Sequence, residues 1–259
     1  MNTDPYRKHL QLCQKLGIRY LPSEPIPPTV SPVQPTSQKQ AMESPSFKSE
    51  ILAPVDYSKL KVTWNPNQTE IGKKLLEFYG QICECQKCSL GASRKNFVFG
   101  SGNPQTEIMF VGEAPGEEED NQGLPFVGRA GQLLTKIIES VGLWKRNEVF
   151  ICNILKCRPP FNRQPQPSEV EACFPYIHHQ IQLIQPKMIV ALGLTAAAAL
   201  LKTKSTLGKL RNQWHDYAGI PLRVTYHPAA LLRVDAYKKE VWDDMKIIRD
   251  KFMTMTNKK

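Results

Sequence analysis

No stretch of this 259-residue sequence is apolar for long enough to predict a helix that crosses a membrane. The longest apolar run, between Ile189 and Leu201, is interrupted by Gly193 and Thr195, and it predicts a buried strand followed by a helix. The first residues carry charged side chains and are not followed by the apolar core of a secretory signal. We therefore expect a cytoplasmic protein that does not contact a membrane.

Negatively charged residues are fewer than positively charged ones in this chain. It has 34 Lys and Arg against 24 Asp and Glu, which leaves a net charge of +10 and an isoelectric point near 9.2. A basic balance favours an anionic partner, most often nucleic acid, although basic proteins that bind no nucleic acid are common. Composition alone therefore leaves the partner open.

Cysteine is present in an odd number, seven, which does not suit a disulfide framework in a reducing compartment. Cys85 and Cys88 form a CxxC pair, and Cys157 and Cys173 form a second, widely spaced pair. Four thiolates suit either an iron–sulfur cluster or a tetrahedral zinc ion. Spacing does not decide between these metals, and Cys83 is a competing ligand.

Composition divides the chain into three segments. Residues 1–20 predict a short amphipathic helix. Residues 21–56 are rich in Pro, Ser, Gln and Thr, which predicts a disordered linker. The remaining segment, 66–255, is expected to be the folded domain.

Short apolar runs alternate with helical periodicities along this domain. The expected strands are 108–111, 149–151, 188–192 and 222–226. The expected helices lie at 69–80, 133–141, 195–201 and 241–252, and another begins at a capping box of Ser168 and Glu171. Such alternation predicts an α/β fold in which helices cover both faces of a parallel sheet.

Polar side chains follow three of these strands, at Glu113, Asn153 and His227. In open α/β sheets, ligands bind beyond the carboxyl ends of the strands. We therefore expect these three side chains to meet in one site.

Four longer motifs, in this order, carry a family resemblance. They read CQKCSLGASRKNFVFGSGNP from Cys85, FVGEAPGEEEDNQGLPFVGRAGQLL from Phe110, CNILKCRPPFNRQPQPSEVEAC from Cys152 and TYHPAALLR from Thr225. Together they resemble the fourth family of uracil-DNA glycosylases over residues 85–233.

The resemblance implies an αβα sandwich with a four-stranded parallel sheet and a [4Fe–4S] cluster. It places the cluster ligands on Cys85, Cys88, Cys157 and Cys173, and it leaves Cys83 outside the set. The cluster is expected to be structural, because its ligands tie the segment before the first strand to the loop and helix after the second. The implied activity is monofunctional removal of uracil from single- or double-stranded DNA, which leaves an abasic site in base excision repair.

Uracil excision requires a flipped nucleotide, a held base and stabilisation of the departing anion. Phe126 offers an aromatic face for stacking on the base, with core packing as the alternative. The Asn153 amide complements the O4 and N3–H edge of uracil and mismatches the N4 amine of cytosine. His227 stands where a hydrogen-bond donor to uracil O2 is needed.

The loop after the first strand is expected on the water side of the base. Gly112 lets the backbone approach the ligand closely. Ala114 occupies the position at which the best-known glycosylase family has a water-activating Asp, and the fourth family shares this gap. Glu113 is the preferred carboxylate for orienting water, and Glu119 is a second candidate, although its acidic run reads equally well as a solvated turn.

DNA contacts are expected from cations near loops and from an apolar wedge. Leu231, or Leu232 in its place, fits the gap left by a flipped base, with helix core as the alternative. The candidates for phosphate contacts are Arg158, Arg163, Lys209, Arg211 and Arg233.

Two other interpretations stay open at this point. The chain could be a catalytically weak DNA-binding relative associated with replication or repair proteins, although Glu113, Asn153 and His227 are all present. The metal could be zinc instead of iron. We further expect a monomer whose N-terminal segment is available to a replication or repair partner.

Overall fold

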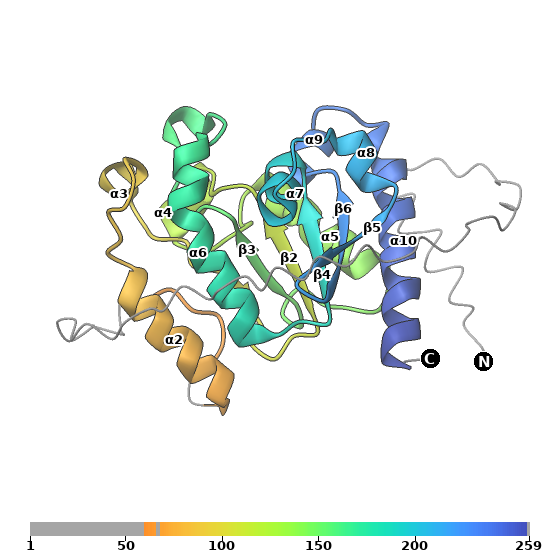
Figure 1. Cartoon of the computed structure of the whole chain (residues 1–259), viewed down its shortest axis with the longest axis horizontal. Coiled ribbons are helices and arrows are strands. Elements are labelled where there is room, and N and C mark those ends of the chain that lie inside the picture. The colour runs from red at the N-terminus through yellow and green to blue at the C-terminus, as the bar shows by residue number, and fades with distance from the viewer. Residues whose placement is uncertain (1–59, 66–67, 258–259) are drawn as a thin grey trace, which may run out of the picture. The chain divides into compact units, whose positions relative to one another are not determined.

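The computed structural model describes residues 60–65 and 68–257, all of which belong to one compact unit. The helix expected at 1–20 and the linker expected at 21–56 lie outside the described residues. A six-stranded sheet forms the centre of the unit, with the strand order β1-β3-β2-β4-β6-β5 (Figure 1).

The four inner strands are parallel, as the sequence predicts. They are β2 (Ile108–Gly112), β3 (Phe150–Asn153), β4 (Met188–Leu192) and β6 (Ile220–Thr225). β2 and β4 are apolar and fully buried, which is typical of parallel sheets, whereas β3 ends in the polar Asn153 and β6 begins half-buried and contains Arg223 and Thr225.

Two antiparallel edge strands were not predicted. β1 (Ser101–Gly102) is too short to leave a pattern in the sequence, and β5 (Trp214–Tyr217) mixes polar and aromatic residues. β5 joins β6 through Ala218 and Gly219, whose φ angles are 52° and 87°. Two positive φ angles in a two-residue loop are the requirement of a tight hairpin turn.

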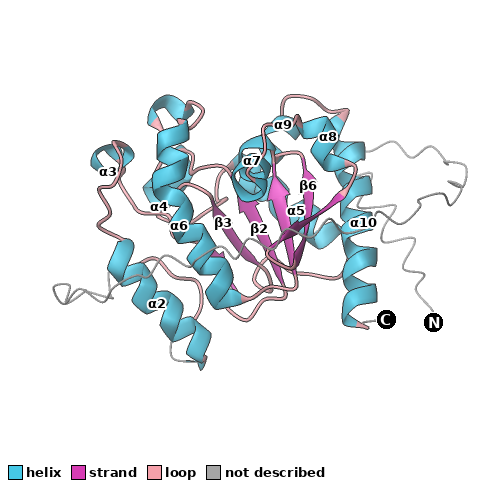
Figure 2. Ribbon diagram, in the orientation of Figure 1, coloured by secondary structure: helices cyan, strands magenta, loops and turns pink. Residues whose placement is uncertain are grey.

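Helices cover both faces of the sheet (Figure 2). None of them, within the described part of the chain, has the length and apolar character that crossing a membrane requires. Their bounds are α2 Glu70–Ile82, α3 Leu90–Ser93, α4 Glu117–Gln122, α5 Arg129–Ser140, the 3₁₀ turn η3 Pro160–Asn162, α6 Pro167–Ile184, α7 Leu194–Leu201, α8 Leu207–Arg211, α9 Pro228–Leu231 and α10 Tyr237–Thr256.

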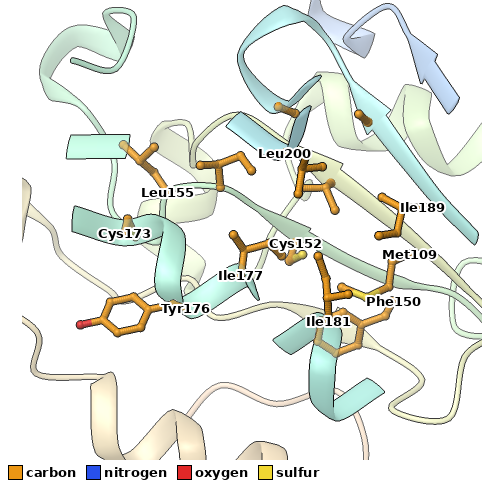
Figure 3. Close-up of a cluster of buried hydrophobic side chains, with 14 of the residues drawn as sticks. Met109, Phe150, Cys152, Leu155, Cys173, Tyr176, Ile177, Ile181, Ile189 and Leu200 are labelled. Atoms are coloured by element: carbon orange, nitrogen blue, oxygen red, sulfur yellow. The ribbon is translucent and has the colours of Figure 1, made fainter. Parts of the chain in front are cut away.

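Alternate residues of each strand enter different cores. Met109 and Val111 of β2 pack with α2, α6 and α7, whereas Ile108 and Phe110 pack with α5, α9 and α10. In Figure 3, Ile177 and Ile181 of α6 lie beside β3 in the first core. This period of two in the strands produces the three layers, and it confirms the expected αβα sandwich.

The capping box expected at Ser168 and Glu171 is wrong by two positions. α6 begins at Pro167, with Gln166 as its N-cap. Glu169 Oε2 accepts a hydrogen bond from the Gln166 backbone N–H at 2.8 Å. Proline suits the first helical position because its φ is preset and it has no N–H to satisfy, so the helix begins before Ser168.

Candidate active site

The carboxyl ends of β2, β3 and β6 open into one cavity of about 700 Å³. Glu113, Asn153 and His227 all line it, so the structure brings together the three strand-end side chains that the sequence singles out. The register explains the convergence, because Gly112 at the end of β2 pairs with Asn153 at the end of β3.

The Asn153 side chain is 1% exposed, and its Oδ1 has no hydrogen-bond partner within the described residues. Gly112 makes room for it, since a Cβ at that position would lie 2.4 Å from Asn153 Oδ1 and 2.5 Å from Phe126 Cζ. Burying a hydrogen-bond acceptor without a partner costs free energy, because the acceptor loses its bonds to water. Asn153 is therefore shaped to receive a donor from a ligand.

Phe126 both lines the cavity and packs into the core that contains α5. Its backbone is left-handed, with φ 53°, which is unusual for an aromatic residue and marks a constrained site. Gly131 permits this conformation, because a Cβ there would lie 1.9 Å from the Phe126 carbonyl oxygen. The ring centroid is 5.5 Å from that of His227, so the two rings share one wall of the cavity.

His227 is the N-cap of α9, and its Nδ1 accepts a hydrogen bond from the Ala229 backbone N–H at 3.2 Å. Burial, and secondarily the positive charge of Arg233, lower the pKa of His227 to about 4. The imidazole is therefore neutral at neutral pH. Because Nδ1 acts as an acceptor, the single proton is on Nε2, and His227 presents a neutral N–H donor.

Glu113 is held by a residue that the sequence did not suggest. Thr195 Oγ1, at the start of α7, donates a hydrogen bond to Glu113 Oε2. Leu155 N–H donates to the Glu113 carbonyl oxygen at 3.0 Å. Thr195 follows the end of β4 closely, so the strand-end rule that found the other three residues also points to it.

Glu119 lies at the cavity, but its carboxylate is occupied by backbone groups. Its Oε1 accepts from the N–H groups of Val127 and Gly128, both at 2.9 Å, and its Oε2 accepts from Gly116 N–H at 3.1 Å. These bonds connect the loop after β2 to the loop that carries Phe126. Ala114 lines the same wall as a small apolar side chain.

The four cysteines Cys85, Cys88, Cys157 and Cys173 line a second, narrower hollow, and Cys83 does not. Tyr176 Oη donates to Cys85 Sγ at 3.0 Å. Burial raises the pKa of Cys157 to about 11 and that of Cys173 to about 12, so these thiols stay protonated unless a cation binds them. Within residues 60–65 and 68–257, no group of three or more His, Cys, Asp or Glu side chains is arranged so that it could hold a metal ion.

A fully buried lysine connects the two regions. Lys156 Nζ donates to the Asn153 carbonyl oxygen at 2.9 Å and to Gln180 Oε1 at 2.6 Å. Gln180 Nε2 in turn donates to the Phe99 carbonyl oxygen at 3.0 Å. Burial lowers the pKa of Lys156, and the neighbouring thiols of Cys152, Cys173 and Cys157, in that order, oppose that shift. Nothing in the local sequence predicts this buried cation, because its partners are fixed by the tertiary fold.

Among the expected DNA contacts, Arg163 and Arg233 line the cavity. Arg158 lies beside it and pairs with Glu117 at 3.5 Å, and Lys209 is exposed on α8. Arg129, which the sequence analysis did not select, is exposed at the start of α5 and also lines the cavity.

Two of the expected contacts are not available at the surface. Arg211 is buried, and its Nε and Nη2 both donate to Asp244 Oδ2, at 3.0 and 2.9 Å. Leu231 is 2% exposed and packs against α10, whereas its neighbour Leu232 is 44% exposed. Helix core, the alternative for Leu231, is therefore the position that the structure gives it.

Comparison with known proteins agrees with the motifs. A family model of the uracil DNA glycosylase superfamily matches residues 99–246. The chain is 44% identical over 179 residues to a type-4 uracil-DNA glycosylase of Saccharolobus solfataricus, which covers 66% of this chain and 82% of that protein. It is 46% identical over 167 residues to the type-4 enzyme of Thermotoga maritima, covering 62% and 85%. A type-5 uracil-DNA glycosylase of Pyrobaculum aerophilum is 30% identical over 146 residues, covering 50% and 64%.

Proposed function

The chain belongs to the uracil DNA glycosylase superfamily, among its type-4 members, and from this premise we propose that it removes uracil from DNA by hydrolysing the N-glycosidic bond. The observation that carries the proposal is the unpaired, buried Oδ1 of Asn153 in the cavity at the strand ends. A DNA repair enzyme of this kind flips the damaged nucleotide out of the helix and leaves an abasic site.

Base recognition rests on Asn153. Its Oδ1 accepts the N3–H of uracil, and its amide N–H donates to O4. Cytosine presents an amine in place of O4 and an acceptor at N3, so both contacts become mismatched. A site that leaves buried polar groups unpaired rejects the wrong base strongly. Phe126 stacks on the face of the flipped base.

Departure of the base rests on His227. Negative charge grows on the uracil ring as the glycosidic bond breaks, and a donor aimed at O2 stabilises it. The neutral Nε2–H serves as this donor, since the pKa near 4 keeps the ring uncharged and the Ala229 N–H fixes the tautomer. His227 therefore acts by hydrogen bonding, without transferring its proton.

The water side of the reaction rests on Glu113. Thr195 fixes one of its oxygens, which leaves the other to orient water or to offset positive charge on the sugar. Ala114 supplies no general base, so the reaction depends mainly on stabilising the departing base. Glu119 acts indirectly, because its three backbone bonds hold the loops of the cavity.

We also propose that Cys85, Cys88, Cys157 and Cys173 hold a [4Fe–4S] cluster. They line one hollow, and Arg94 Nη1 lies 3.6 Å from Cys157 Sγ, where its charge balances an anionic cluster. Four thiolates also suit a tetrahedral zinc ion, so the choice of the cluster rests on the resemblance to type-4 uracil-DNA glycosylases. When bound, the cluster would join the segment before β1 to the loop between β3 and α6.

Uracil-containing DNA is the proposed partner. We propose that Arg129 and Arg233, which line the cavity, contact phosphates around it, whereas the guanidinium of Arg163 is already paired with Glu169. The cytoplasmic location, the monomeric state and a replication or repair partner for the N-terminal segment stay predictions from the sequence.

Alkaline strand cleavage tests the activity. Iron-containing protein is incubated with an oligonucleotide that carries a single uracil, and alkali then breaks the strand at any abasic site. We expect cleavage at the uracil, with none at a cytosine in a matched strand. Binding of the uracil strand without cleavage would instead support the catalytically weak relative. Iron and sulfide quantitation of the same brown protein separates the cluster from zinc.

A further inference from the structure

The side chain of Phe161 is 98% exposed, at the middle of the turn η3 between β3 and α6. The next most exposed large apolar side chain in the described residues is Leu232, at 44%. Single exposed apolar side chains are common on protein surfaces, so the significance of this ring depends on where it lies.

Phe161 stands at the edge of the proposed uracil site. Pro159, before it in the chain, lines the cavity, and so do Asn162 and Arg163 directly after it. The turn that carries Phe161 therefore forms part of the border of the cavity.

The backbone conformation of the turn η3 directs the Phe161 ring toward solvent. Phe161 and Asn162 both have left-handed backbones, with φ 55° and 54°. This conformation is common for asparagine but unusual for an aromatic residue. Asn162 N–H donates to the Pro159 carbonyl at 3.0 Å, and Arg163 N–H donates to the Pro160 carbonyl at 3.1 Å.

Side chains on both sides brace this backbone. Arg158 Nε donates to Asn162 Oδ1 at 2.8 Å, and Arg163 donates to both oxygens of Glu169 on α6, at 2.9 and 2.6 Å. Phe161, between these two anchors, is left free to present a flat apolar face.

We propose that Phe161 stacks on a nucleobase of the substrate strand that neighbours the flipped uridine. The inference deepens the proposed function and rests on DNA being the substrate. Nucleobases are the flat apolar groups that this substrate brings to the rim, and every base offers a face for stacking, so the contact adds affinity without sequence preference.

Binding measurements with Phe161→Ala, Phe161→Trp and the remote control Ile247→Ala test the proposal. The probe is a single-stranded oligonucleotide with 2′-fluoro-2′-deoxyuridine, whose glycosidic bond resists cleavage. We expect the Kd to rise on the order of tenfold in Phe161→Ala. Phe161→Trp and Ile247→Ala should bind as the wild type does, and all variants should excise uracil equally fast at saturating DNA. An unchanged Kd in Phe161→Ala overturns the proposal.

Photo-crosslinking gives a readout that does not depend on activity. A strand with 5-iododeoxycytidine on either side of the uridine analogue should crosslink to the peptide that contains Phe161, and Phe161→Ala should lose this product. Crosslinks that map only elsewhere overturn the proposal, whether or not the protein excises uracil. Conversely, a wild type that crosslinks at Phe161 but cleaves no uracil strand refutes the proposed function and leaves this contact standing.

Discussion

The cavity at the strand ends and the hollow of the four cysteines are lined by residues that are close in sequence but differ in their chemical groups. Asn153 and Cys157 are only four positions apart, yet one leaves a buried oxygen unpaired in an open cavity and the other is a buried thiol in a narrow hollow. The first arrangement suits a ligand that enters and leaves. The second suits a permanently bound group that holds the scaffold.

Lys156 is the physical connection between these two regions. It lies between Asn153 and Cys157 in the chain. Its Nζ donates to the Asn153 carbonyl oxygen, and the thiols of Cys152, Cys173 and Cys157 are close enough to affect its pKa. Substitutions made separately in the cavity, in the cysteine hollow and at Lys156 should therefore distinguish residues that bind the base from residues that hold the scaffold.

The largest effect is expected from Cys157→Ala. Loss of a ligand should remove the iron, and because metal binding contributes directly to folding, much of the protein should become insoluble or lose its cooperative thermal transition. Iron content and a thermal melt measure this. Cys83→Ser is the matched control, since Cys83 lies outside the hollow, and it should retain full iron. Equal iron loss in both variants would show that the ligand set is wrong.

Asn153→Ala should impair recognition of the base in the cavity while the fold and the iron content stay intact. Uracil excision should fall about 10²- to 10³-fold, the cost of losing hydrogen bonds that stabilise the reacting base in an enclosed site. Single-turnover excision measures the fall, and iron content should equal that of the wild type. A rate near that of the wild type would refute the role of Asn153.

Lys156→Met tests the connection. The change keeps the length and packing of the side chain but leaves Asn153 O and Gln180 Oε1 without their donor, at a cost of about 1–3 kcal/mol for each buried acceptor. We expect lower thermal stability together with slower excision, since the Asn153 backbone loses its support. Chemical denaturation and single-turnover rates report the two effects. If Lys156→Met lowers the free energy of unfolding but leaves the excision rate unchanged, Lys156 supports only the scaffold and does not support catalysis.

The smallest effect concerns pH. With a His227 pKa near 4, below the 6.5 of an unfolded chain, the ring is neutral and folding gains from that neutrality above about pH 6.5. This gain is lost as the pH falls from 6.5 toward 4. Excision should therefore show no titration from His227 between pH 8 and 5, in a pH–rate profile compared with that of His227→Gln. A wild-type titration near 6.5 that is absent from His227→Gln would contradict the neutral donor.

The sequence predicted what depends on local patterns. The four parallel strands follow from short apolar runs, and Glu113, Asn153 and His227 follow from the rule that ligands bind at strand ends. Long-range pairing was not predictable in the same way. Thr195 is 82 positions from Glu113, and the pairing of Arg211 with Asp244 depends on how α8 meets α10.

Exposure was the least predictable property of the site. Leu231 and Leu232 are adjacent and chemically identical, and only the packing of α9 decides which one is buried. Phe161 attracted no prediction of its own, although it is the most exposed large apolar side chain in the described residues. Its left-handed backbone could not be predicted from the residue type, since aromatic residues rarely adopt that conformation.

A crystal structure with a single-stranded oligonucleotide that contains 2′-fluoro-2′-deoxyuridine would show how the base is bound. We expect uracil in the cavity, with N3 within hydrogen-bonding distance of Asn153 Oδ1 and O2 facing His227 Nε2. Uracil bound elsewhere, or in the cavity with Asn153 Oδ1 still unpaired, would contradict this expectation.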